Sequence, residues 1–379
     1  MDSMLRYLIV MLLTALSGLG QSIVDPSRFT PAMLDFEGEY HEAPLQCEVT
    51  PIHPALNYGF RFQAGYVTRI PMSQYLGKGH LLVTLMRVTP EGGGKPIYLG
   101  SRMRLPEIPP TKNEMELGGG FLLGKGRYDV SWQMWDDKSR VCRKHWKIDA
   151  HLSHSEKLVT VALPPGAVAD FSLRGAPKSL LAPDDAAPVR LTVLLHAAPL
   201  SPRRFRLGVR DRILLTGTLS SLLERMPVKS VRLVVFNLDQ QKELYRDEHF
   251  ERQSLTQVAQ SISSVELGKV DFEVLKNRGG HVDLLADLIN GELTAKEPSD
   301  VVLFLGPEAR FSDKVPPDEL EKVSGSAPRF FYLQYRPYLL QTATFPDIIV
   351  RTISKLKGRT MVIRTPGDFA KAIDQVERR

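Results

Sequence analysis

The stretch VRLTVLLHAAPL, residues 189–200, decides the fold of the second half of the chain. An apolar run that ends in small residues and a proline is typical of a strand buried on both faces, as in a parallel sheet covered by helices. Open sheets of this kind bind ligands beyond the carboxyl ends of their strands. The sequence therefore predicts that a site in this half lies at His196 to Leu200.

Strands and helices alternate after this stretch. The apolar spacing predicts helices over 212–226, 254–265, 281–293 and 347–358, and a last helix that opens at Thr365 and Pro366. It predicts strands over 230–238, 242–250, 271–275, 300–306, 330–335 and 359–364, the charged 242–250 being an edge strand. Such alternation favours a doubly wound, mostly parallel sheet with helices on both faces.

The first half has a different pattern, in which short strands alternate with turns. In residues 126–137, Tyr128, Val130, Trp132 and Met134 fall on one face of a predicted strand. A hairpin follows at 136–139, and another is predicted around the glycines 92–94. The run GKGRYDVSWQMWDD resembles the terminal hairpin of many immunoglobulin-like modules in exported bacterial proteins. We expect an immunoglobulin-like β-sandwich over 25–163, a proline- and alanine-rich linker over 164–188, and the α/β domain over 189–379.

Residues 1–21 have the composition of a secretory signal peptide. Arg6 precedes the apolar run YLIVMLLTAL, and Gly18-Leu19-Gly20 is a small-x-small cleavage site. A membrane anchor is the alternative, although the run is shorter than the roughly 20 residues that span a bilayer. We expect a soluble mature chain that is secreted or periplasmic.

The only two cysteines, Cys47 and Cys142, both lie in the first half. An exported chain with a single pair of cysteines most simply forms one disulfide bond. Two buried free thiols are the alternative, because sequence does not give the distance between the residues.

The net charge of +6 is mild and identifies no partner by itself. Export makes nucleic acid an unsuitable partner, so we expect none. Tryptophans 132, 135 and 146 lie near several cationic residues, a combination that stacks on sugars or holds an anionic polymer. Core packing beside a solvated edge is the other interpretation. Trp135 faces away from Trp132 and is therefore the candidate for contact with a partner.

Residues 188–379 resemble the von Willebrand factor type A (VWA) family. The resemblance rests on the first strand and its small-residue turn, the early edge strand, the helix led by Gly279-Gly280, and the closing phrase RTMVIRTPGDFAKAIDQV. It implies a Rossmann-like sheet of six strands with one antiparallel edge. It also implies, in many members, a metal-ion-dependent adhesion site at the strand tips.

That metal site requires Asp-x-Ser-x-Ser after the first strand, a Thr at the head of the glycine-led helix and an Asp after the fourth strand. The positions that correspond here are His196, Ala198 and Leu200, then His281, then Gly306 with Pro307. Because a hard divalent cation needs carboxylate and hydroxyl oxygens, the resemblance implies a degenerate site without Mg²⁺. We expect no cofactor.

Two alternatives concern the same edge of the sheet. His196 and His281 could begin a softer site for Zn²⁺ or Ni²⁺, with Asp283 or Glu308 as a further ligand. The other interpretation is that they are two polar side chains in a vestigial crevice. The segment PRRFRLGVRDR, residues 202–212, includes Arg203, Arg204 and Arg206. These arginines either bind an anion or lie in a solvated loop.

The motifs of nucleophile elbows, zinc proteases, phosphate-binding loops and dinucleotide-binding loops are absent from the sequence. The sequence therefore favours an exported, non-enzymatic module that binds a protein or an envelope component. A metal-dependent enzyme or metal-binding protein that uses His196 and His281 is the second hypothesis, and a passive structural component of an envelope assembly is the third.

Overall fold

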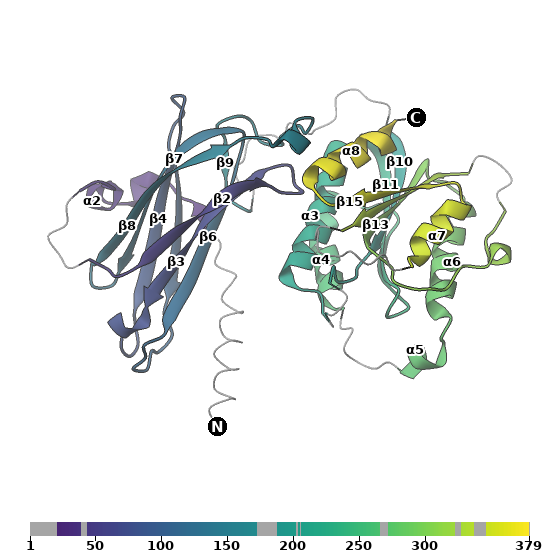
Figure 1. Ribbon diagram of the computed structural model, residues 1–379, viewed down its shortest axis with the longest axis horizontal. Coiled ribbons are helices and arrows are strands. Elements are labelled where there is room, and N and C mark those ends of the chain that lie inside the picture. The colour runs from purple at the N-terminus through teal and green to yellow at the C-terminus, as the bar shows by residue number, and fades with distance from the viewer. Residues whose placement is uncertain are drawn as a thin grey trace. The chain divides into compact units, whose positions relative to one another are not determined.

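The computed structural model divides the chain into two compact units, residues 1–180 and 181–379 (Figure 1). It describes residues 21–38, 44–172, 188–201, 204, 206–265, 272–322, 327–336 and 346–378. The predicted signal peptide, apart from Gln21, and most of the predicted linker lie outside these residues. No helix in the described part of the chain is both long enough and apolar enough to cross a bilayer.

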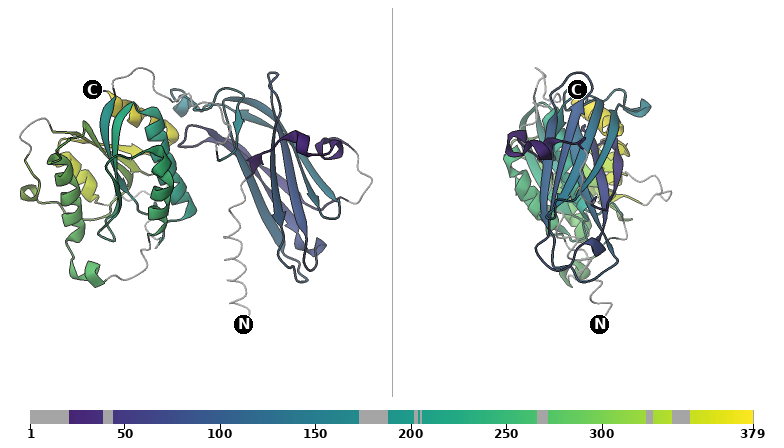
Figure 2. Two further views of the ribbon diagram at one scale, coloured as in Figure 1. Left: turned by 180° about the vertical axis from the view of Figure 1, so that it is seen from behind. Right: turned by 90° about the vertical axis from the view of Figure 1, so that its left-hand side faces the viewer.

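The first unit consists of two antiparallel sheets (Figures 1 and 2). The five-stranded sheet has the order β1 (Ser22–Ile23), β5 (Ile97–Arg104), β4 (Leu81–Pro90), β7 (Gly126–Asp136) and β8 (Val141–Ala150). The four-stranded sheet has the order β2 (Glu48–Leu56), β3 (Phe62–Pro71), β6 (Glu114–Leu123) and β9 (Val168–Ala169). The helical turns among its described residues are short and include the α-helical turn α2 (Pro31–Leu34). This unit therefore has the β-rich architecture that the alternating pattern predicts.

The inner faces of the two sheets carry the aromatic residues of the core. Trp132 of β7 is 1% exposed, and its ring centroid lies 5.3 Å from that of Tyr66 in β3. Tyr128, Val130 and Met134 are buried on the same face of β7. The period-two pattern of the sequence thus identifies the face of β7 that enters the core.

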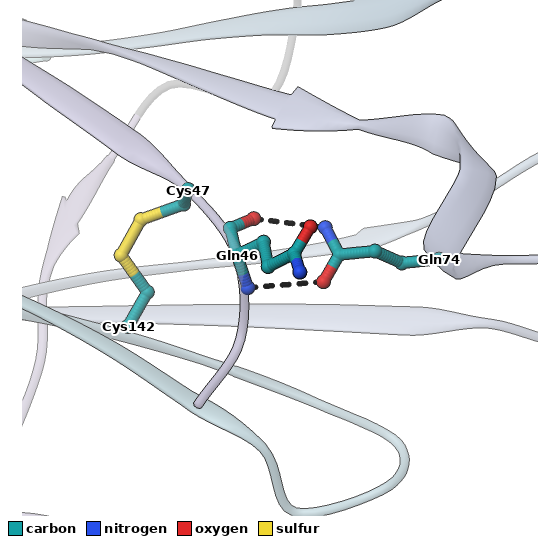
Figure 3. The surroundings of a disulfide bond; sticks show 4 residues. All are labelled: Gln46, Cys47, Gln74 and Cys142. Atoms are coloured by element: carbon teal, nitrogen blue, oxygen red, sulfur yellow. Dashed lines mark hydrogen bonds between the residues drawn. A yellow bond between two sulfur atoms is a disulfide. The ribbon is translucent and has the colours of Figure 1, made fainter. Parts of the chain in front are cut away.

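A disulfide bond joins the two sheets at one edge of the sandwich. Cys47 immediately precedes β2 and Cys142 lies in β8, with their Cα atoms 6.2 Å apart (Figure 3). Next to it, the Gln74 side chain makes two hydrogen bonds with the backbone of Gln46: it accepts from N at 3.0 Å and donates to O at 2.8 Å. The prediction of a disulfide is confirmed.

Part of the predicted linker belongs to the sandwich. Val168 and Ala169 form β9 and pair with Leu123 and Leu122 of β6. The prediction that the linker starts at residue 164 is therefore wrong for this segment. Two residues are too few to show a strand period, and only their pairing with β6 reveals it.

The second unit contains a six-stranded sheet of order β12-β11-β10-β13-β14-β15. The strands are β10 (Val189–His196), β11 (Val228–Asn237), β12 (Lys242–Asp247), β13 (Val301–Pro307), β14 (Arg329–Tyr335) and β15 (Arg359–Ile363). β10 pairs in parallel with β11 on one side and with β13 on the other. The charged strand β12 is the antiparallel edge. This half of the chain therefore has the mostly parallel sheet that its alternation predicts.

Helices cover both faces of this sheet (Figures 1 and 2). One face carries α6 (Gly280–Leu293) and α7 (Ile348–Lys355), and their apolar side chains form one core with Leu194, Val234 and Phe304. The other carries α3 (Val209–Arg225), α4 (Leu255–Ser263) and α8 (Pro366–Glu377). Thr365 caps α8 as predicted, its Oγ1 accepting from the Asp368 amide at 3.2 Å.

Two predicted elements of this unit differ from the structure. Helix α3 begins at Val209 instead of residue 212, because the Asp211 carboxylate accepts from the Gly208 amide at 2.6 Å and fixes the first turn. Residues 271–275 were predicted as a strand, but 272–276 form helix α5 (Phe272–Lys276). Phe272 is 74% exposed, so the burial that would stabilise an apolar strand is missing there.

The disulfide should make a measurable contribution to the stability of the first unit. Cys47 and Cys142 are 95 residues apart, and a bond that closes so long a loop restricts the unfolded chain strongly. We expect Cys47→Ser/Cys142→Ser to lower the free energy of unfolding by about 2–4 kcal/mol. All three tryptophans lie in the first unit, so tryptophan fluorescence during urea unfolding reports on this unit. An unchanged midpoint would show that the bond contributes nothing.

Candidate functional site

The carboxyl end of β10 is buried instead of open. His196 is 1% exposed, its Nδ1 lies 3.3 Å from the Pro307 carbonyl oxygen, and its ring stacks on Phe236 with centroids 5.2 Å apart. β13 approaches so closely that a Cβ on Gly306 would lie 2.6 Å from the His196 carbonyl oxygen. Only glycine fits at position 306 without displacing one of the two strands.

The residues that directly follow β10 have mainly buried apolar side chains. Ala197 is fully buried, Ala198 is 4% exposed and Leu200 is 7% exposed. The Ala197 carbonyl oxygen accepts from Asn237 Nδ2 at 2.7 Å, so the turn is fastened to the end of β11. Residues 197–200 therefore present no carboxylate or hydroxyl oxygen to a ligand.

Asp347 is a buried carboxylate near this edge of the sheet that our sequence reasoning did not identify as a site residue. Its Oδ1 accepts from the amides of Ile349 at 2.9 Å and Val350 at 3.2 Å, and so caps α7. Its Oδ2 accepts from Gln334 Nε2 at 2.7 Å and from the Ala309 amide at 3.1 Å. The available signal was an Asp at the first position of the predicted helix 347–358, because Asp is a preferred capping residue at the start of a helix.

Burial changes the acidity of both His196 and Asp347. Desolvation lowers the pKa of His196, because the protonated imidazole has lost its hydration. Desolvation raises the pKa of Asp347, while its hydrogen bonds from Gln334 and backbone amides oppose that rise. At neutral pH His196 is therefore a neutral ring. Its Nε2 has no hydrogen-bond partner among the described residues.

The two histidines predicted as candidate metal ligands have separate partners. His281, at the start of α6, lies 3.0 Å from Asp313 through its Nε2 and stacks on Phe311 with centroids 4.2 Å apart. The carboxylates proposed as further ligands are engaged elsewhere, Asp283 with Asn277, and Glu308 with the side chains of Arg310 and Arg336. Within the described ranges, no three His, Cys, Asp or Glu side chains form a group that could hold a metal ion.

The predicted anion-binding arginines are only partly described. Arg203 lies outside the described residues, and Arg206 is exposed. Arg204 is 56% exposed in its side chain, with Nη1 3.9 Å from Asp211 Oδ2. Asp211 also accepts from the Leu200 amide at 3.3 Å and so joins the turn after β10 to helix α3. Anion binding at these arginines stays a prediction.

Trp135 is not available as an exposed contact. It is 8% exposed and packs with Phe36 and Leu85 under residues 24–36. Trp135 does lie on the face opposite Trp132, but the N-terminal segment covers that face, which contradicts its prediction as a partner contact. The cover comes from residues about 100 positions earlier in the chain, which strand periodicity does not reveal.

A cavity lies within the first unit. It has a volume of about 1520 Å³ and is lined by residues of both sheets, including Tyr66, Thr68, Leu82, Met103 and Leu117. Our sequence reasoning missed it, because its walls come from strands that are distant in the sequence.

Comparison with known proteins does not assign the chain to a family. No family model matches the sequence, and no curated protein matches it. The putative ApaA protein of Bordetella pertussis is 10% identical over 29% of this chain and 98% of its own, with a TM-score of 0.22. A β-glucuronidase 2 of Bacteroides uniformis is 8% identical over 77% of this chain and 36% of its own, with a TM-score of 0.18. An exo-chitosanase of Amycolatopsis orientalis is 13% identical over 78% and 33%, also at 0.18. These scores support no argument on function.

The buried His196 should make the second unit less stable in acid. Because burial lowers the pKa of His196 below its ordinary 6.5 in the folded state, the unfolded chain binds more protons below that pH. The stability that neutral His196 contributes therefore falls as the pH drops from 6.5, by at most about 1.4 kcal/mol per pH unit. We expect His196→Phe, which keeps a ring against Phe236, to reduce this loss.

Among the described residues, every helix of eight or more residues lies in the second unit, so ellipticity at 222 nm during urea unfolding measures this effect. The matched control is His249→Gln, an exposed histidine that should leave the pH dependence as it is. Equal acid sensitivity in the native chain and in His196→Phe would contradict the assignment.

Proposed function

We propose that this chain is an exported, non-enzymatic interaction protein whose second unit is a VWA-like domain without a metal site. The order of its strands supports the proposal, since the sheet has six strands and one antiparallel edge strand, β12. Those are the features that the sequence resemblance implies. The helix led by Gly279 and Gly280 packs on one face of that sheet through Leu285 and Ile289.

The observation that carries the proposal is the state of the carboxyl edge of the sheet. A metal-dependent adhesion site needs oxygen ligands around the cation and one coordination position open to a partner's carboxylate. Here β10 is followed by buried methyl groups, and the nearby Asp347 carboxylate accepts five hydrogen bonds, from Ala309, Tyr332, Gln334, Ile349 and Val350. Partner binding by this unit is therefore independent of divalent cations.

The burial of His196 does not suit a catalytic residue. A general base must reach the proton it removes, directly or through one water. The His196 ring is enclosed by Phe236 and the Pro307 carbonyl group and is 1% exposed, so a substrate does not reach its Nε2. We infer that His196 has a structural role, which leaves binding as the activity of this edge.

We expect the partner to contact the exposed arginines beside this edge, Arg204 and Arg206, which we call the rim. Arg204 and Arg206 lie between β10 and α3 and point outward from the turn that Asp211 fastens. Arginine pairs well with carboxylates and other anionic groups. A protein or an envelope component with acidic groups fits this rim.

Crosslinking in the native host tests the function directly. Protein that carries a C-terminal streptavidin-binding tag is crosslinked, purified with and without EDTA, and analysed by mass spectrometry. We expect one partner in the same yield under both conditions, and at least about a fivefold lower yield with Arg204→Glu/Arg206→Glu. The matched control is Lys229→Glu/Lys371→Glu, which changes the same charge at exposed positions away from the rim.

Three results would contradict the proposal. Loss of the partner in EDTA would indicate a metal-dependent contact. Stoichiometric zinc or nickel in the untagged protein would favour the metal-binding hypothesis. Absence of any partner would favour a passive structural role.

A further inference from the structure

The sandwich of the first unit is closed along one edge and open along the other. The disulfide between Cys47 and Cys142 joins β2 to β8 at the closed edge. At the opposite edge, β1 pairs with β5 only at Leu99 and Gly100, and β9 pairs with β6 only at Leu122 and Leu123. In the part of the chain that the structure describes, β5 residues 101–104 and β6 residues 114–121 have no strand on their outer side.

Unpaired strand edges of this kind are binding surfaces. Every second residue of an edge strand directs its backbone N–H and C=O groups outward, where another strand can pair with them. Proteins usually protect such edges with a bulge, a proline or a covering segment. The described residues place none of these over β5 residues 101–104.

The cavity of about 1520 Å³ lies between the two sheets and borders this open edge. Four methionines line it together with other apolar side chains, namely Met72, Met103, Met115, Met134, Leu82, Leu105, Ile108 and Leu117. Met103, Met115 and Leu117 are only partly buried and therefore mark the mouth. Flexible methionine side chains adapt to different apolar groups, which is typical of surfaces that bind varied partners.

Two buried polar atoms in the cavity wall need a partner. Gln21, 6% exposed, donates from Nε2 to the Tyr66 hydroxyl at 2.9 Å, but its Oε1 has no hydrogen-bond partner among the described residues. Thr68 is 1% exposed, and its Oγ1 also has no hydrogen-bond partner among the described residues. Both residues line the cavity. A buried acceptor without a partner is destabilising, so these atoms indicate a ligand that carries hydrogen-bond donors.

Charge at the open edge is uneven. Arg102 and Arg104 of β5 are exposed and form no ion pair with any described residue. Of the acidic residues that border the cavity, Glu116 pairs with Arg69 at 3.5 Å and Glu107 with Lys78 at 3.0 Å, while Glu114 at the start of β6 is exposed. The two arginines are two positions apart on one strand, so they project from the same face of β5. Arg102, Met103 and Arg104 all border the cavity, and Met103 projects from the opposite face of β5 to the two arginines.

We propose that this cleft binds an extended polypeptide segment of a partner, which adds to the free edge of β5 as a further strand. The added strand continues the line of β1 beyond Gln21. Its apolar residues enter the cavity beside Met103, and acidic residues at alternate positions lie beside Arg102 and Arg104. The inference rests on the proposed function, since it specifies what one binding surface of an interaction protein recognises.

An extended peptide accounts for more of these features than an acyl chain does. Its N–H groups can pair with β5 and supply donors to the buried oxygens of Gln21 and Thr68. Its alternating side chains match an apolar cavity on one side and two arginines on the other. An acyl chain would fill the apolar space but leave the strand edge and the buried oxygens without partners.

Synthetic peptides test the specificity. The probes are fluorescein-labelled peptides with three Val-Glu repeats or three Val-Lys repeats, measured by fluorescence anisotropy on the full exported protein. We expect the Val-Glu peptide to bind at least about fivefold more tightly than the Val-Lys peptide. Arg102→Glu/Arg104→Glu should reverse that order. The matched control Lys125→Glu/Lys138→Glu changes two exposed residues of the same unit and should preserve it.

Hydrogen exchange locates the bound peptide. The Val-Glu peptide should slow the exchange of amides in residues 101–104, and Leu117→Trp, which fills the mouth, should weaken binding. The proposal would be overturned if neither peptide bound, or if Arg102→Glu/Arg104→Glu left the order of the two peptide affinities unchanged. Protection of amides away from β5 would overturn it as well. If dodecanoate bound and neither peptide did, the cleft would be an acyl-chain site and the proposal would also be overturned.

The failure of this inference is distinguishable from failure of the proposed function. The crosslinked partner is captured again with Arg102→Glu/Arg104→Glu. If the peptides do not bind but the partner is recovered in full, the interaction function stands and the cleft is not its surface. If the peptides bind and no partner is recovered, the cleft site stands and the proposed function fails.

Discussion

Burial of β10 on both faces and along both edges is the constraint on which the second unit depends. β11 and β13 flank the strand, and its side chains from Leu191 to His196 are all buried. Water cannot satisfy polar groups at such a position, so protein groups must do so. The neutral His196 ring, the Asn237 side chain bonded to the Ala197 carbonyl oxygen, and the glycine at 306 all follow from this requirement.

Asp347, near the ends of β13 and β14, is another buried polar group whose partners are protein groups. Its carboxylate begins helix α7 and also accepts from Gln334 in β14 and from the Ala309 amide after β13. One side chain therefore joins two strand ends to a helix start. A carboxylate used in this way stabilises the edge of the sheet and is not free to bind a cation. This is the physical basis for proposing metal-independent binding.

The first unit is subject to a different constraint, because the outer strands at both edges of a sandwich have unpaired backbone groups. The disulfide and the paired Gln46 and Gln74 close one edge covalently and through hydrogen bonds. The opposite edge is covered over a short distance by β1 and β9, where the Ile23 amide donates to Asp170 Oδ2 at 3.3 Å. Beyond that contact the sheets leave a cavity between them. The two edges of the sandwich are thus closed to different extents.

The sequence by itself determined the features that depend on local periodicity. The alternation in 126–137 identified the buried face of β7, the apolar run at 189–196 identified the central strand, and Thr365-Pro366 marked the start of α8. The single pair of cysteines predicted its own bond. Each of these signals is contained in one short segment or in a single pair of residues.

Tertiary structure alone decided what depends on distant segments. Trp135 is buried because residues 24–36 cover it, and β9 is a strand because β6 pairs with it. Asp347, Gln334 and Ala309 converge only when three elements pack together, and the cleft exists only because two sheets separate at one edge. Periodicity shows which face of an element is apolar. Which other element covers that face is set by the packing of the whole chain, and packing therefore decides which surfaces are closed and which stay open.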